Sequence, residues 1–175
     1  TQWNTFVEFF CRQSREHLRN TFRQWCDSRP PGNKFAWRKT DKLSGSSPAM
    51  RWTNPPVAWM MHAGIQPMLH SGLAFPAHRY PRKRTHIRRI ALEAYPGFTA
   101  RKITRNSYKS DSPAKQTRER QDRRELILDA LSAGQAGLAI RFEADRQWRK
   151  RIIADARGDF LDAVICSLQA GHAAL

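Results

Sequence analysis

The excess of positive charge is the feature that most constrains what this chain can fold into. Lysine and arginine number 31 against 15 aspartate and glutamate, which gives a formal net charge of +16 over 175 residues. Fifteen of the basic residues and four of the acidic ones lie between Arg79 and Arg124. A compact fold with this charge repels itself unless a polyanion relieves the repulsion, and guanidinium groups suit bidentate contact with phosphate. We therefore expect a nucleic acid, DNA or RNA, as the partner; the alternative is a solvated basic face with no specific partner.

Apolar side chains are abundant enough to build a core. Hydrophobic residues make up 40% of the chain and include six tryptophans and nine phenylalanines, whereas disordered chains have few such side chains. The length suits one domain, so residues 1–175 are predicted to form a single domain. No apolar run reaches the roughly 18 residues that a membrane span needs, so no contact with a membrane is expected.

The cysteines and the first residues indicate where the protein works and how it begins. Cys11, Cys26 and Cys166 are odd in number and widely spaced, unlike the paired cysteines of disulfide frameworks and zinc sites. Reduced thiols in a cytoplasmic protein are the expectation. The chain has no initiator methionine and enters a helical pattern almost at once, so we expect it to start inside a longer protein.

Apolar periodicity predicts a helix-rich chain with one strand. Helices are expected over residues 5–25, 57–69, 113–132, 140–156 and 159–173, where apolar side chains recur every three or four positions. Residues 33–53 are polar, contain Gly45 and Pro48, and are predicted to form a long surface loop. Ile87 to Tyr95 alternates apolar and other side chains, which is typical of a strand.

Two carboxylates stand at positions that suit chemistry on phosphates. Glu93 lies near the end of the predicted strand, and Asp162 lies one turn into the last predicted helix, three residues after Asp159. Hard oxygen ligands of this kind hold Mg²⁺ or Mn²⁺, which can activate water against a phosphodiester. The alternatives are structural: Glu93 pairs with a neighbouring arginine, and Asp162 stabilises the start of its helix.

The order of several short motifs resembles a known family. The motifs are Ala91-Leu92-Glu93-Ala94-Tyr95-Pro96-Gly97, then Ser107-Tyr108-Lys109, then Arg123 or Arg124 before Ile127-Leu128, and finally Asp159-Phe160-Leu161-Asp162-Ala163-Val164-Ile165-Cys166. Together they resemble the closing half of the domain of unknown function 429 family, a group of predicted RNase H-like nucleases. Residues 3–10, 38–41 and 56–69 are similar to the middle region of that family.

The resemblance implies an α/β fold, in which a mixed sheet is flanked by helices. It makes Glu93 and Asp162 the catalytic metal ligands, and Lys109 a phosphate contact. The family's opening strands, which carry its first aspartate, have no counterpart here. They are expected upstream of Thr1, and that missing part of the protein would be needed to complete the sheet and the metal site.

Two functions from different classes follow from the sequence. The first is metal-dependent hydrolysis of nucleic-acid phosphodiesters, with Asp159 as a further metal ligand. In that reading Arg88, Arg89, Arg123 and Arg124 join Lys109 in binding the substrate. The second is a non-catalytic basic domain that binds or scaffolds nucleic acid; a third, weaker alternative is an acidic protein partner. Trp37 and Trp52 are either core residues or base-stacking platforms, whereas Trp59 is expected in the core.

Overall fold

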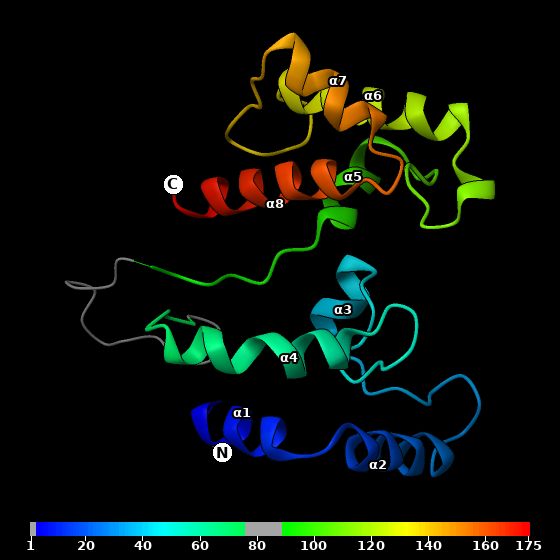
Figure 1. The fold of residues 1–175 in the computed structure, drawn as a ribbon, viewed down its shortest axis with the longest axis vertical. Helices are drawn as coiled ribbons and strands as arrows, with labels where there is room; N and C mark the ends of the chain where they lie inside the picture. The colour runs from blue at the N-terminus through cyan, green and yellow to red at the C-terminus, as the bar shows by residue number, and fades with distance from the viewer. Residues whose placement is uncertain (1–2, 76–88) are drawn as a thin grey trace. The chain divides into compact units, whose positions relative to one another are not determined.

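The structure is a computed structural model that describes residues 3–75 and 89–175 (Figure 1). In these residues the regular elements are helices, and extended pairing is limited to one parallel bridge between Ala74 and Ile90. The predicted α/β fold, an RNase H-like mixed sheet flanked by helices, is therefore wrong. The described chain is all-helical.

The predicted strand shows why no sheet forms in the described residues. Ala91 N donates to Ala74 O at 2.9 Å and Ala74 N donates to Arg89 O at 3.1 Å, and these are the pairing bonds between described residues of the two segments. Ile90 and Leu92 remain about half exposed. A strand is stable when neighbouring strands pair with it along its length and one of its faces is buried. Among the described residues, this segment has a single bridge and no buried side chain. Its first two residues, 87 and 88, lie outside the described part of the chain.

The chain divides into two compact units, Thr1–Glu93 and Ala94–Leu175, and each is described by itself. The helices of the first unit are α1 (Trp3–Arg12), α2 (Arg15–Asp27), α3 (Lys39–Ser44) and α4 (Val57–His70). Helix α1 packs against α4, and the buried residues there include Val7, Phe10 and Ala58. The Phe10 ring meets the edge of the His62 ring with their centroids 5.6 Å apart.

One long helix was expected over residues 5–25, and the structure divides it at Ser14. This residue has extended backbone angles, and its Oγ accepts a hydrogen bond from His17 N at 3.1 Å. Serine is a strong helix N-cap because its hydroxyl satisfies a backbone N–H that the first turn leaves open. Helix α2 therefore begins anew at Arg15. The predicted loop over residues 33–53 likewise contains a helix, α3, which ends where Gly45 adopts a left-handed conformation with φ of 63°.

The second unit packs four α-helices around one core. These are α5 (Pro96–Ile103), α6 (Arg118–Ser132), α7 (Arg146–Ala154) and α8 (Asp159–Ala173), with a short 3-10 helix, η2 (Pro113–Lys115), before α6. The buried core side chains come from every α-helix: Ala100 of α5, Ile127, Leu128 and Leu131 of α6, Ile152 of α7, and Leu161, Ile165 and Leu168 of α8. Figure 1 shows α6, α7 and α8 gathered in this way.

The helix bounds of this unit follow local capping rules. Helix α8 has the bounds expected from its apolar spacing. Helix α7 is shorter than the predicted 140–156, because Asp145 caps it by accepting from Trp148 N at 2.8 Å. Pro96, expected to close a strand, is instead the first residue of α5, where proline needs no N–H partner. No helix in the described parts of the chain is long and apolar enough to cross a membrane.

Candidate nucleic-acid interface

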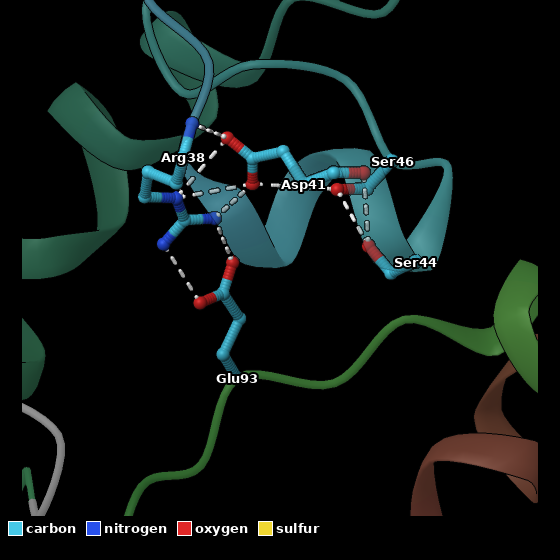
Figure 2. A network of polar contacts seen from close by, with 5 residues as sticks. All are labelled: Arg38, Asp41, Ser44, Ser46 and Glu93. Carbon is cyan, nitrogen blue, oxygen red and sulfur yellow. Dashed lines mark hydrogen bonds and ion pairs between the residues drawn. The ribbon is translucent and has the colours of Figure 1, made fainter.

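Glu93, a predicted metal ligand, is held by an arginine of the same unit (Figure 2). Arg38 Nη1 and Nη2 lie 2.9 and 2.6 Å from the two carboxylate oxygens of Glu93, which makes a bidentate ion pair. The same guanidinium binds Asp41, with Nη2 at 2.6 Å and Nε at 3.0 Å from Oδ1. Arg38 thus joins two carboxylates, and Glu93 has an arginine as its described partner.

Asp41 is the buried member of this network. Its Oδ2 accepts from the backbone N of Arg38 at 3.0 Å, and its Oδ1 accepts from Ser46 Oγ at 3.4 Å. Burial disfavours the charged carboxylate, but the hydrogen bonds from Arg38 outweigh it and lower the pKa of Asp41 below its usual value. The bonds with Glu93 and then Asp41 raise the pKa of Arg38. The network therefore favours the charged forms of Arg38 and Asp41.

Asp162, the other predicted metal ligand, also has its own partners, in the second unit. Tyr108 OH donates to its Oδ1 at 2.5 Å, and Lys109 Nζ pairs with its Oδ2. Burial, followed by the bond and the charge of Asp162, raises the pKa of Tyr108, so the phenol stays protonated and donates. The structure thus brings together the predicted residues Asp162 and Lys109, and a tyrosine completes the group.

A glycine allows the Tyr108–Lys109 segment to lie this close to the start of α8. Gly158 precedes the helix with φ of +74°, and a Cβ there would lie 2.9 Å from Lys109 Cβ. Side chains other than glycine rarely adopt this φ, and the added atom would collide with Lys109. A backbone hydrogen bond also joins this segment to the residues before α8, since Ser110 N donates to Ala156 O at 3.1 Å.

The described carboxylates do not gather into a metal-ligand cluster. Asp159 lies exposed in the first turn of α8. Within residues 3–75 and 89–175, no three side chains of His, Cys, Asp or Glu lie together as a metal ion would need. Mg²⁺ or Mn²⁺ at Glu93, Asp162 and Asp159 stays a prediction.

The predicted substrate-binding arginines have different surroundings. Arg124 is buried, and it donates from Nε to Ile153 O and from Nη1 to Tyr108 O, each at 2.7 Å. Burial lowers the pKa of Arg124. Arg89 is exposed and donates to Ser71 O at 2.7 Å, and Arg88 lies outside the described residues. Arg123 lines a hollow on the surface of its unit.

That hollow, the basic pocket, lies at the start of α6. It has a volume of about 430 Å³, and its charged lining side chains are Lys115, Arg120, Arg123 and Glu119. The Nε atom of Arg123 is buried and has no hydrogen-bond partner among the described residues. Arg120 is fixed by a 2.6 Å bond from Nη1 to Lys115 O. Three cations against one carboxylate make the pocket attractive to an anion.

A second basic surface, the α2 arginine stripe, lies in the first unit. It consists of Arg15, Arg19 and Arg23, which are spaced four residues apart and therefore share one face of α2. All three are exposed, and none forms an ion pair with a described residue. The guanidinium carbons of Arg15 and Arg19 lie 5.8 and 6.0 Å from the centroid of the Trp59 ring.

Sequence reasoning did not select the stripe, although its signal was present. The four-residue spacing of the three arginines is visible in the sequence, and this spacing places them on one face of any helix that contains them. The tryptophans beside the stripe are half-buried: Trp52 stacks on Phe22 with centroids 5.9 Å apart, and Trp59 lies 6.4 Å from Phe22. Trp37 is exposed.

Comparison with known protein families, curated proteins and solved structures found no match to this chain.

Proposed function

We propose that this chain binds nucleic acid through the phosphate backbone. The observation that carries the proposal is the α2 arginine stripe. Like charges four residues apart on a helix destabilise it by about 0.2–0.5 kcal/mol per pair. Arg15 adds to this cost because it is the first residue of α2, where the helix dipole disfavours a cation.

A polyanion is the partner that removes this cost. Guanidinium groups bind phosphate oxygens bidentately, and the stripe offers one such group per turn of the helix. The basic pocket supports the same partner, since its lining has three cations, Lys115, Arg120 and Arg123, and one carboxylate, Glu119. Contacts of this kind fix a protein on a nucleic acid without reading its sequence.

The test is a salt titration of affinity with two triple variants of equal charge. Arg15→Gln, Arg19→Gln and Arg23→Gln together remove the stripe; Lys34→Gln, Lys39→Gln and Lys42→Gln remove three exposed charges from the same unit. Affinity is measured by fluorescence anisotropy of a labelled oligonucleotide at several salt concentrations. The stripe variant should make the plot of log K against log salt shallower. The magnitude of its slope should fall by about two to three, since each lost phosphate contact on a duplex contributes about 0.9.

The control decides between a specific surface and net charge. We expect the lysine variant to keep most of the slope. If both variants lower it equally, the stripe is not the interface and only total charge attracts the nucleic acid. If wild-type protein shows no salt-dependent affinity for DNA or RNA, the proposed function is wrong.

Metal-dependent hydrolysis stays a prediction. Glu93 and Asp162 each have a cation as their described partner, Arg38 and Lys109 respectively. Incubating the same oligonucleotides with Mg²⁺ or Mn²⁺ tests it, because cleavage by a nuclease of this type would be lost in Glu93→Gln and Asp162→Asn.

The cytoplasm is the compartment we propose for this function. The three cysteines are free thiols, and burial raises the pKa of each, which keeps them protonated and poorly reactive. Unpaired buried thiols are common where the surroundings are reducing.

A further inference from the structure

A groove in the second unit has an apolar, aromatic lining that is separate from the α2 arginine stripe and the basic pocket. This groove, the aromatic groove, lies between α7, the segment before α7, and α8, and has a volume of about 630 Å³. Its apolar lining consists of Phe142, Trp148, Ile152, Phe160, Val164 and Leu168. Ligand sites commonly have volumes of about 300–1,000 Å³. The groove is therefore large enough for a flat ring and its substituents.

Two aromatic side chains that line this groove, Trp148 and Phe160, are partly exposed to solvent. Trp148 is 47% exposed and Phe160 is 43% exposed, so both rings are accessible to a ligand in the groove. The guanidinium carbon of Arg151 lies 4.3 Å from the centroid of the Trp148 ring and 5.7 Å from that of Phe160. Exposed rings next to an arginine are the arrangement on which proteins stack unpaired bases.

The charges along α7 select the kind of occupant. Helix α7 contains no acidic residue, and its Arg151, which lies beside both rings, is exposed without an ion pair among the described residues. Glu143 and Asp145 also line the groove, and Asp145 is engaged in capping α7. An apolar peptide would leave the Arg151 cation beside the rings unused, and an acidic peptide would leave the rings unused. A polynucleotide with unpaired bases uses both.

We propose that the aromatic groove binds unpaired bases, so that the nucleic acid this chain prefers is single-stranded. The inference rests on the proposed function and deepens it. In a duplex the faces of the bases are covered by their neighbours, so a duplex can reach the basic surfaces but cannot fill the groove.

The experiment compares single-stranded and duplex oligonucleotides of equal length with leucine variants of the groove. Trp148→Leu and Phe160→Leu keep an apolar side chain but remove the ring. Phe98→Leu is the matched control, because Phe98 is also 43% exposed, has Lys102 Nζ 5.0 Å from its ring centroid, and does not line the groove. Each groove variant should weaken single-strand affinity roughly fivefold or more and leave duplex affinity unchanged.

Two further measurements keep the result interpretable. Trp148→Phe retains a ring and should retain most of the single-strand affinity, which separates lost stacking from damage to the fold. Equal affinity of wild-type protein for both strand forms, or leucine variants that behave like Phe98→Leu, would overturn the groove proposal. In that case the arginine-stripe variant would still weaken binding, whereas failure of the proposed function itself leaves no salt-dependent binding to any nucleic acid.

Discussion

At the scale of single residues, two cations organise the carboxylates of the two units. Arg38 binds the buried Asp41 and the exposed Glu93, and Lys109 pairs with Asp162 beside Tyr108. The two ion pairs of Arg38 differ in surroundings, since the side chain of Asp41 is 0% exposed and that of Glu93 is 69% exposed. Water screens an exposed pair and cannot replace the bonds of a buried one, so the two carboxylates contribute unequally to stability.

Replacing each carboxylate by its amide measures this difference. Asp41→Asn should cost about 1–3 kcal/mol of unfolding free energy, because it leaves buried hydrogen-bond partners poorly satisfied. Glu93→Gln should cost less than about 1 kcal/mol, because that pair is exposed. Urea unfolding followed by circular dichroism gives both values. Equal costs would mean that burial does not distinguish the two pairs.

The effect of Asp41→Asn has a defined pH dependence. The pKa of Asp41 is lower in the folded chain than the unfolded value of about 3.9, so its charged form stabilises the fold above that pH. That contribution is lost as the pH falls through the lower, folded pKa. The stability difference between wild type and Asp41→Asn should therefore shrink in acid.

At the scale of elements, the helices of the second unit are stabilised by one buried face each. Helix α6 illustrates this, because Ile127, Leu128 and Leu131 are buried whereas Leu126 is exposed. Helices of this length are marginal alone in water, so their stability comes from packing of the apolar face. Helix α2 differs, since its arginine stripe faces outward and it buries only Leu18 and Cys26.

Two leucines of α6 provide a matched test of this packing. Leu128→Ala removes a side chain that is 0% exposed and should cost about 2–5 kcal/mol. Leu126→Ala removes the same atoms from a position that is 45% exposed and should cost less than about 1 kcal/mol. Thermal unfolding measures both, and similar losses would contradict the packing of α6 described here.

At the scale of the whole molecule, the positive charge is unevenly divided between the two units. Residues 1–93 contain 16 basic and 5 acidic side chains, and residues 94–175 contain 15 and 10. The first unit therefore carries most of the excess, although it contains fewer buried apolar side chains among its described residues. Self-repulsion should be greatest there, and salt screens such repulsion over about 10 Å at 0.1 M.

Added salt should accordingly stabilise the free protein. We expect the Tm to rise by several degrees between about 20 and 300 mM NaCl, a range over which the Debye length shrinks severalfold. Differential scanning calorimetry measures the change, and the stripe variant should show a smaller rise because fewer charges repel each other. A Tm that falls with salt would mean that ion pairs outweigh repulsion.

The sequence by itself determined the features that depend on near neighbours. The bounds of α8 follow from residues within a few positions of one another, because helix bonds join residues four apart. The basic character of the chain follows from its composition. The charge pattern of the sequence also indicated Arg123, which lines the basic pocket, as a binding residue. It did not distinguish Arg123 from Arg124, since one position along a helix changes which face a side chain occupies.

Only the tertiary structure decided what depends on distant residues. Glu93 pairs with Arg38, 55 positions away, and Asp162 pairs with Lys109, 53 positions away. Ile90 and Leu92 have an alternating pattern that suits a strand, but a strand also needs neighbours, and the described chain gives Ile90 a single bridge. Pairing, burial and the exposure of Trp148 and Phe160 are properties of the packed chain, so the local pattern could not fix them.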